Sequence, residues 1–155
     1  MKEQRFEIAS VLGAAPSEVW TRVTTPEGIN HELMPLLRMT VPRHLRTIDA
    51  DTIPIGRKAF RSWGFLFGVI PFDYDDLTLA RLDPGKGFLE RSTMLSQRSW
   101  EHERTLEPVP EGTRVTDRLR FVPRFPPGRF HRAFVATIFR HRHRRLRRYF
   151  GGDPL

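Results

Sequence analysis

The C-terminal stretch from Pro127 to Phe150 constrains the fold more than any other part of the sequence. A proline–glycine pair marks its start, a glycine pair follows its end, and no proline or glycine lies between residues 129 and 150. These signals predict one long helix over residues 128–150. Such a helix is about 33 Å long at 1.5 Å per residue, which is enough to cross a small domain.

The predicted helix is amphipathic. At 100° per residue, its apolar side chains fall mainly on one broad arc. The members of this arc are Phe130, Phe134, Val135, Ile138, Phe139, Leu146, Tyr149 and Phe150. Arg142 and Arg145 interrupt the arc, so we expect them either to reach out to solvent or to meet polar partners beneath the helix. The apolar arc predicts that this helix packs on the remainder of the chain.

The net positive charge of the sequence is concentrated in the same helix. The formal net charge is +8, and residues 129–148 contain 8 arginines and no acidic residue, which leaves 18 basic and 18 acidic residues elsewhere. A solvated helix face that complements the helix dipole explains this run, and we favour it. The alternative is attachment to an anionic surface. Nucleic acid is disfavoured as the partner, whereas a membrane surface stays open; the oligomeric state is not indicated.

Composition indicates a folded chain. With 155 residues, 39% of them apolar, the sequence is expected to form a single domain over residues 1–155 with a substantial core. No apolar run is long enough to span a bilayer, and the first residues lack the hydrophobic region of a signal peptide, so we expect a cytoplasmic protein. The absence of cysteine excludes disulfides, thiolate catalysis and zinc held by sulfur.

Before the long helix, the spacing of apolar residues is first that of a strand, then that of a helix, and then again that of a strand. Residues 5–12 read as a strand, and Pro16 and the Thr25-Pro26 pair start two short helices, the second ending near Leu33. The later strands are expected over residues 36–41, 58–68, 72–82, 88–95, 98–107 and 113–123. This order predicts an α+β fold, in which an antiparallel sheet of six or seven strands curves around the long helix.

Two motifs suggest a family. Residues 6–20 read F-x-I-A-S-x-L-x-A-A-P-S-E-V-W, and Trp100 on an alternating strand is followed by Arg-Val-Thr-Asp at residues 114–117. Together with the element order, this resembles the helix-grip superfamily, also called SRPBCC. It includes START lipid-transfer, birch-pollen-allergen-like and polyketide cyclase/dehydrase-like proteins. The resemblance implies a mainly apolar cavity between sheet and helix, but no single activity.

Our first functional interpretation is a binding module for a small hydrophobic or amphipathic ligand in that cavity. The cavity would be enclosed by the last helix, the sheet and the connection at residues 42–57. We expect aromatic and aliphatic residues to line it, with two arginines supplying polar contacts. These candidates are Trp63, Phe65, Phe88, Trp100, Phe134 and Ile138, together with Arg104 and Arg142. We expect no cofactor.

Strand alternation also places charged residues inside. Trp100 and Leu106 mark the buried side of one strand, and Leu119 marks that of the next. The same parity, extended to the preceding strand, brings four ionisable side chains inward. These are Glu90, His102, Arg104 and Asp117. The predicted cavity wall is therefore partly polar.

These inward charges allow two interpretations. In an enzyme of the cyclase, dehydratase or hydratase kind, His102 would transfer protons and Glu90 or Asp117 would orient it. Arg104 and Arg142 would then hold an anionic oxygen. In a structural network, Arg104 would pair with Asp117 and Arg142 with Glu90. We favour the network, because structural ion pairs often resemble active sites.

The sequence does not indicate a metal site. His141 and His143 point in different directions on a helix, and neither has a histidine or carboxylate four residues away to complete a zinc pair. In the acidic cluster at residues 73–76, alternation sends neighbouring carboxylates to opposite faces. We expect this cluster to form a solvated edge that pairs with arginines.

Overall fold

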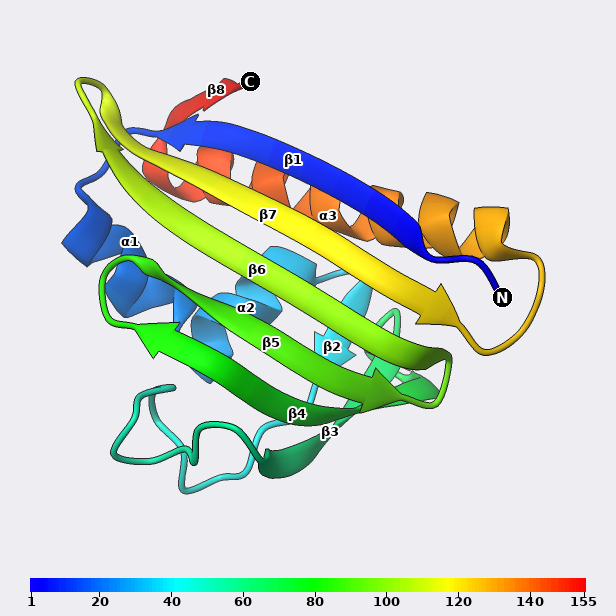
Figure 1. The fold of residues 1–155 in the computed structure, drawn as a ribbon. Coiled ribbons are helices and arrows are strands. Elements are labelled where there is room, and N and C mark those ends of the chain that lie inside the picture. Colours follow the sequence, from blue (N-terminus) through cyan, green and yellow to red (C-terminus); the bar gives the residue numbers. More distant parts are fainter.

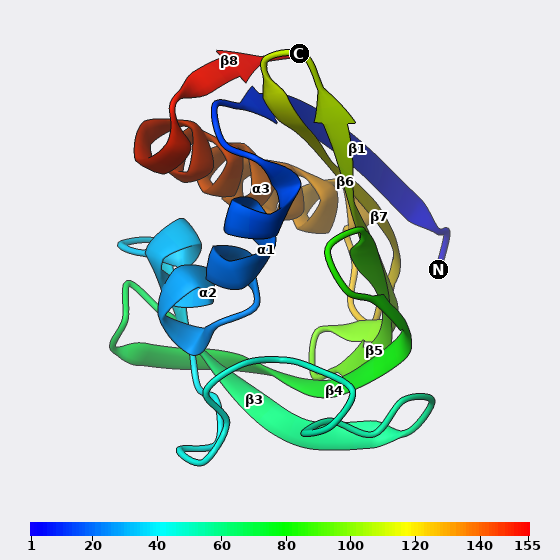
Figure 2. The same ribbon diagram turned by 90° about the vertical axis from the view of Figure 1, so that its left-hand side faces the viewer.

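The computed structural model describes residues 1–155, and its long C-terminal helix lies inside the curve of an eight-stranded sheet (Figures 1 and 2). The elements are β1 (Gln4–Leu12), α1 (Pro16–Val23), α2 (Pro26–Leu33), β2 (Leu37–Met39), β3 (Lys58–Leu66), β4 (Ile70–Asp83), β5 (Gly87–Met94), β6 (Gln97–Val109), β7 (Gly112–Pro123), α3 (Gly128–Phe150) and β8 (Gly152–Pro154). The strand order is β2-β3-β4-β5-β6-β7-β1-β8, and all neighbouring strands are antiparallel. The predicted α+β fold is confirmed.

The two short helices lie beside α3, within the curve of the sheet (Figure 2). The hydroxyl of Thr25 caps α2 by accepting a hydrogen bond from the Gly28 amide at 3.0 Å. Gly28 also lets the two helices approach closely, because a Cβ at this position would lie 1.9 Å from the carbonyl oxygen of Arg22. Proline at the first helical turn and the threonine cap therefore locate both helices correctly from sequence.

The edges of the sheet differ most from the expectation. β2 is only three residues long, and Pro71 lies near the start of β4 instead of ending the preceding strand. A further three-residue strand, β8, follows α3 and pairs with the end of β1, where Pro154 lies opposite Ser10. The sequence did not predict β8, because a Gly-Gly-Asp-Pro segment carries no alternating pattern.

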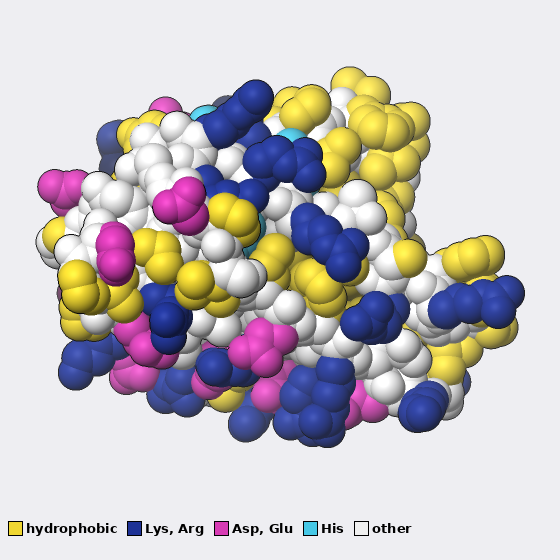
Figure 3. Space-filling model, turned by 90° about the horizontal axis from the view of Figure 1, so that it is seen from above, with side chains coloured by type: hydrophobic (Ala, Val, Ile, Leu, Met, Phe, Trp, Pro, Cys, Tyr) yellow, Lys and Arg dark blue, Asp and Glu magenta, His cyan; other side chains and the backbone are white.

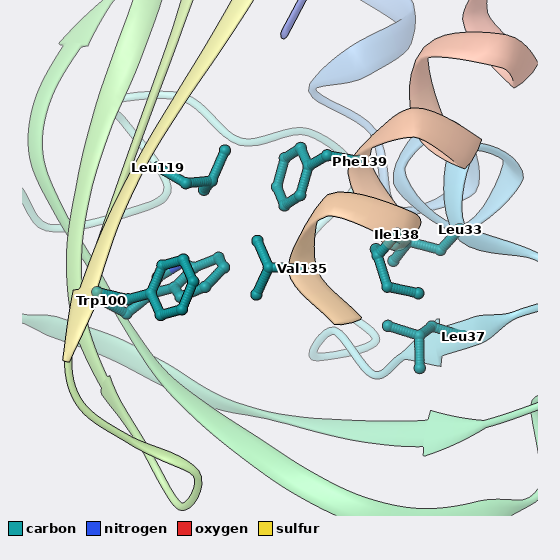
Figure 4. Packing of buried hydrophobic residues seen from close by; sticks show 8 residues of the cluster. Leu33, Leu37, Trp100, Leu119, Val135, Ile138 and Phe139 are labelled. Carbon is teal, nitrogen blue, oxygen red and sulfur yellow. The ribbon is translucent and has the colours of Figure 1, made fainter. Parts of the chain in front are cut away.

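Three apolar clusters fill the interior. The largest joins α3 to β6, β7, α2 and β2 (Figure 4), and contains Leu33, Leu37, Trp100, Leu119, Phe121, Val135, Ile138 and Phe139. A second cluster lies under α1 and contains Leu12, Val19, Val23, Leu106, Val115 and Leu146. A third, smaller cluster packs beneath the connection between β2 and β3, with Leu45, Ile53 and Leu79 as its buried members.

A layer of buried polar residues separates the first two clusters. On β7, Asp117 lies between Val115 of the second cluster and Leu119 of the first. Arg104 on β6 and His143 on α3 are buried at the same level, since both are hydrogen-bonded partners of Asp117. This layer of polar residues therefore divides the first apolar cluster from the second.

The buried side of α3 is narrower than the predicted apolar arc. Phe130 and Tyr149 are exposed near the two ends of the helix, whereas Ala136 and His143 are buried. Aromatic bulk alone therefore misplaced the edge of the buried face.

Candidate functional site

Two adjoining pockets lie between the sheet and α3, with volumes of about 130 and 100 Å³. Most of their lining residues are hydrophobic, 11 of 19 in the first pocket and 10 of 17 in the second. The residues that line both pockets are Met39, Asp75, Glu90, His102 and Arg142. The cavity thus has two apolar lobes with four ionisable side chains at their junction.

The first lobe is bounded by α3 and by the largest apolar cluster. Trp100, Phe134 and Ile138 form part of its wall, as the sequence predicted. Phe134 also contacts Phe72 edge-on, with ring centroids 5.8 Å apart, and both rings are partly exposed. The first lobe is therefore bounded on its outer side by an aromatic pair.

The second lobe lies beneath the connection between β2 and β3. Phe88 lines it, as predicted, and Ile48 of that connection covers it together with Val41, two residues after β2. Residues 42–57 therefore contribute to the wall of the cavity, in the place where the sequence analysis put them.

Trp63 and Phe65 do not line the cavity, and their predicted orientation is wrong. Both lie on the outer face of β3, where Trp63 packs edge-on against Tyr74 and Phe65 lies beneath the guanidinium of Arg38. The inward positions of this strand carry Phe60 and the small residues Ser62 and Gly64. Aromatic residues on both parities made the strand ambiguous, and stacking on arginines accounts for the outer ones.

The arginine on β6 forms the centre of a buried ion-pair network. Arg104 is 1% exposed and donates from Nε and Nη2 to the two carboxylate oxygens of Asp117, each at 2.8 Å. The register places these two residues directly opposite each other on β6 and β7. The predicted pairing of Arg104 with Asp117 is confirmed.

The second carboxylate of the network was not predicted. Glu32, at the end of α2 and 1% exposed, accepts two hydrogen bonds from Arg104, at 2.9 and 3.1 Å. Glu32 Oε1 also accepts a bond from Arg142 Nε at 3.0 Å. Arg142 therefore pairs with Glu32, and its predicted pairing with Glu90 is wrong.

Two histidines complete the coordination of Asp117. His102 Nε2 lies 2.7 Å from Oδ1 and His143 Nε2 lies 2.8 Å from Oδ2. Since an ionised carboxylate can only accept, both rings donate from Nε2. The Nδ1 atom of His143 lies 2.9 Å from the hydroxyl of Ser10, which also accepts a hydrogen bond from Arg147. His143 is thus a structural residue, a role that the search for metal ligands did not suggest.

The electrostatics of this network keep Asp117, Glu32 and Arg104 charged. Burial alone would raise the pKa of Asp117, but the positive charge of Arg104 and the hydrogen bond from His102 hold that pKa well below its ordinary value. Burial is opposed in the same way at Glu32, where Arg104 and Arg142 lower the pKa. At Arg104, burial would lower the pKa, but Asp117 and Glu32 raise it.

The hydrogen bonds of Arg104 leave little of its part in the predicted catalytic arrangement. Four of the five N–H groups of the Arg104 guanidinium donate to carboxylates, which leaves a single N–H on Nη1 for an anionic ligand oxygen. His102 Nε2 bonds to Asp117, one of the two partners that the acid–base interpretation named, whereas its Nδ1 lies 4.0 Å from the other, Glu90, beyond hydrogen-bond distance. The structural network therefore describes Arg104 and Asp117 better than the acid–base site does.

A second, smaller group of buried carboxyls lies at the junction of the lobes. Asp75 on β4 is 4% exposed and Glu90 on β5 is 6% exposed, and both line both lobes. Ser92 donates to Glu90 Oε2 at 2.7 Å, whereas Asp75 Oδ1 is buried without any hydrogen-bond partner. Burial, followed by the negative charge of Glu90, raises the pKa of Asp75 well above its ordinary value.

The position of Asp75 corrects the expectation of a solvated acidic edge. Alternation does send neighbouring carboxylates to opposite faces: Asp76 lies outside and pairs with Arg61 and Lys58. Asp75, however, points inward, and Asp73 binds the amide and hydroxyl of Ser96. Only one of these three carboxylates behaves as the surface prediction required.

Most arginines of α3 lie on its solvent side, as the solvated-face interpretation expects. Arg129, Arg132, Arg140, Arg144 and Arg148 are exposed. Basic side chains are spread over the face seen in Figure 3, with acidic side chains between them along one edge. Of the two arginines that interrupt the apolar arc, Arg142 binds Glu32 and Arg145 donates to the carbonyl of His31 at 2.9 Å. Both therefore meet polar partners on α2.

The structure contains no group of three or more histidine, aspartate or glutamate side chains with the geometry to hold a metal ion. None of its helices is long and apolar enough to cross a membrane.

The curved antiparallel sheet, the two helices after β1 and the long helix enclosed by the sheet define the helix-grip fold. The chain belongs to the family described as "Domain of unknown function (DUF8410)", whose model matches residues 10–150. No curated protein matches the sequence.

Solved structures share this fold at low sequence identity. Protein CV1439 from Chromobacterium violaceum has 17% identity and a TM-score of 0.73, with 96% of this chain and 99% of that chain covered. Ara h 8.0201 has 11% identity and a TM-score of 0.65, with 96% and 98% covered. Protein Ms6760 from Mycobacterium smegmatis has 14% identity and a TM-score of 0.63, with 94% and 93% covered. At these identities the similarity is one of fold.

Proposed function

We propose that this protein binds a small hydrophobic or amphipathic ligand in the cavity between the sheet and α3. The observation that carries this proposal is the two-lobed cavity, whose walls are mainly apolar and whose junction is polar. Ligand sites commonly combine apolar walls with a few polar groups that fix orientation. The apolar walls supply contact area, and the polar junction would fix the orientation of the ligand.

The size of the cavity limits the ligand. The lobes measure about 130 and 100 Å³, whereas pockets for drug-sized ligands commonly measure about 300–1,000 Å³. A compact molecule with one aromatic or short aliphatic body suits this space better than a long-chain lipid. Trp100 and Phe139, with ring centroids 6.4 Å apart, supply aromatic surface at the first lobe.

Native mass spectrometry of the protein purified from its own host tests the proposal. We expect a bound small molecule that is released on denaturation. Replacing Ile138 by Trp should fill the first lobe and remove the bound mass, whereas Thr137→Trp, on the exposed side of the same helix, should retain it. A wild-type protein with no bound mass, or equal retention by both variants, would count against a ligand in this cavity.

A further inference from the structure

We infer that the polar group of the ligand is a cation, a protonated amine on a small apolar body, and that it binds between Asp75 and Glu90. This inference rests on the proposed function, which it makes more specific. No other ionisable side chain around the cavity is buried, faces both lobes and has an oxygen without a partner.

The first step concerns hydrogen bonds. Asp75 Oδ1 is buried and receives no hydrogen bond, although its side chain lines both lobes. A buried acceptor without a donor is costly, and native structures nearly always supply one. The protein supplies a donor to Glu90, from Ser92, but none to this oxygen. An N–H group of a ligand in the cavity would supply the missing hydrogen bond to Asp75 Oδ1.

The second step concerns charge. Arg104 and Arg142 are opposed by Glu32 and Asp117, so these four residues are neutral together. Glu90 is left without a cation within salt-bridge distance, apart from His102 Nδ1 at the 4.0 Å limit. Glu90 therefore has no cation in hydrogen-bond contact, which favours a cationic ligand over an anionic one.

Arg142 is the one group that favours the opposite ligand. It lines both lobes, and only its Nε is engaged by Glu32, at 3.0 Å. A carboxylate ligand would have to bind Arg142 while lying beside Asp75 and Glu90. Repulsion from Glu90, and from Asp75 once it is ionised, opposes the binding of such a carboxylate. Removing a carboxylate at this junction should therefore weaken the binding of an ammonium ligand and strengthen the binding of a carboxylate ligand.

Binding of the amine moves one proton. The ammonium group keeps its own protons and donates hydrogen bonds, while the O–H bond of protonated Asp75 breaks and its proton passes to bulk water. Because burial and the charge of Glu90 raise the pKa of Asp75, free protein holds this proton to a higher pH than an ordinary carboxyl. Amine affinity should therefore increase as pH rises through that pKa. Other groups that face the site are Asp73 and Tyr74 from β4, Ser92 from β5, His102 and Arg104 from β6, and Arg142 from α3.

Three probes of similar size test the inference: 2-phenylethylamine, the neutral 2-phenylethanol and the anionic phenylacetate. Titration calorimetry at pH 7 should show the amine binding at least about tenfold more tightly than the alcohol, with phenylacetate weakest. Asp75→Asn should lower amine affinity by at least about tenfold and leave alcohol affinity unchanged. Asp76→Asn, one residue away on the outer face, should change neither.

The outcomes separate the two proposals. Equal binding of the amine and the alcohol, tightest binding of phenylacetate, or an Asp75→Asn variant with full amine affinity would overturn the amine and leave the apolar cavity as a binding site. Binding of none of the three probes would overturn both. Asp75→Asn keeps the size of the side chain and removes only its charge, and circular dichroism should show that the variant folds.

Discussion

Two groups of buried charges in this protein face the same cavity, and they differ in how completely they are hydrogen-bonded. Around Arg104, two carboxylates, two guanidiniums and two histidines form a continuous set of contacts between 2.7 and 3.1 Å. At the junction of the lobes, Asp75 has a buried oxygen without any partner. Both groups perturb pKa values, but only the second has a buried carboxylate oxygen that is free to accept a hydrogen bond from a ligand.

The comparison separates scaffold from site by a physical criterion. A saturated buried ion pair is weak evidence for net stability, yet removing one member leaves an uncompensated charge. An unsaturated carboxyl has the opposite property, since removing its charge relieves the folded protein. Substitutions in the two groups should therefore change stability in opposite directions.

The largest effect is expected for Asp117→Ala. This change leaves Arg104 with only Glu32 and removes the acceptor of His102 and His143, so we expect a loss of about 3–5 kcal/mol in the free energy of unfolding. Urea denaturation followed by circular dichroism measures it. A matched control on the outer face of β6 is Glu103→Ala, which should cost no more than about 1 kcal/mol. A loss of less than about 0.5 kcal/mol for Asp117→Ala would show that Asp117 is not part of a scaffold.

Glu32→Gln should have a smaller effect, about 2–3 kcal/mol, because Arg104 keeps both bonds to Asp117 and Arg142 is partly exposed. The same denaturation experiment measures it. If the variant were more destabilised than Asp117→Ala, the order of importance within the network would be reversed.

Acid should destabilise the protein through the same residues. Asp117 and Glu32 have pKa values lowered by their cationic partners, so their contribution is complete above the unfolded-state value near 4 and is lost as pH falls through the folded values. Each unit by which a pKa is lowered corresponds to about 1.4 kcal/mol. Unfolding free energies measured between pH 7 and pH 3 should decrease, and the decrease should be smaller in Glu32→Gln. An equally large decrease in this variant would show that Glu32 does not contribute to the pH dependence of stability.

The smallest effect, and the one of opposite sign, is expected for Asp75→Asn. Because the folded-state pKa of Asp75 is raised, its ionisable carboxyl destabilises the fold increasingly as pH rises above about 4 and up to the folded value. The variant should therefore be more stable than wild type by about 1 kcal/mol at pH 7, and the difference should shrink towards pH 4. Thermal denaturation at several pH values measures it, with Asp76→Asn as a control that gives no gain. A clear loss of stability at pH 7 would mean that Asp75 has a cationic partner.

Much of the fold follows from local signals in the sequence. Proline at the start of α1 and α2, the Thr25 cap and the glycine pair after Phe150 locate the helices to within a residue or two. Alternation on β6 and β7 correctly turned His102, Arg104 and Asp117 inward. From Trp100 to Leu106 on β6, buried residues alternate with less buried ones without a break.

The rest depended on tertiary contacts that periodicity does not carry. Glu32 lies on a short helix, and its buried position depends on a hydrogen bond from Arg104, which is 72 residues away in the sequence. β3 and β4 contain register shifts and aromatic residues on both faces, so the pattern did not determine the orientation of Trp63 or the burial of Asp75. The cavity residues predicted from β5, β6 and α3 were placed well, whereas those from β3 were not.

A carboxyl titration by ¹³C nuclear magnetic resonance tests the central distinction most directly, because it reads Asp75 and Asp117 in one sample. The account predicts that Asp75 titrates well above the ordinary aspartate pKa and Asp117 well below it. Saturation with 2-phenylethylamine should then lower the pKa of Asp75 and leave that of Asp117 unchanged. If Asp75 titrates at or below the ordinary value in the free protein, the two groups of charges do not differ as described and the account is wrong.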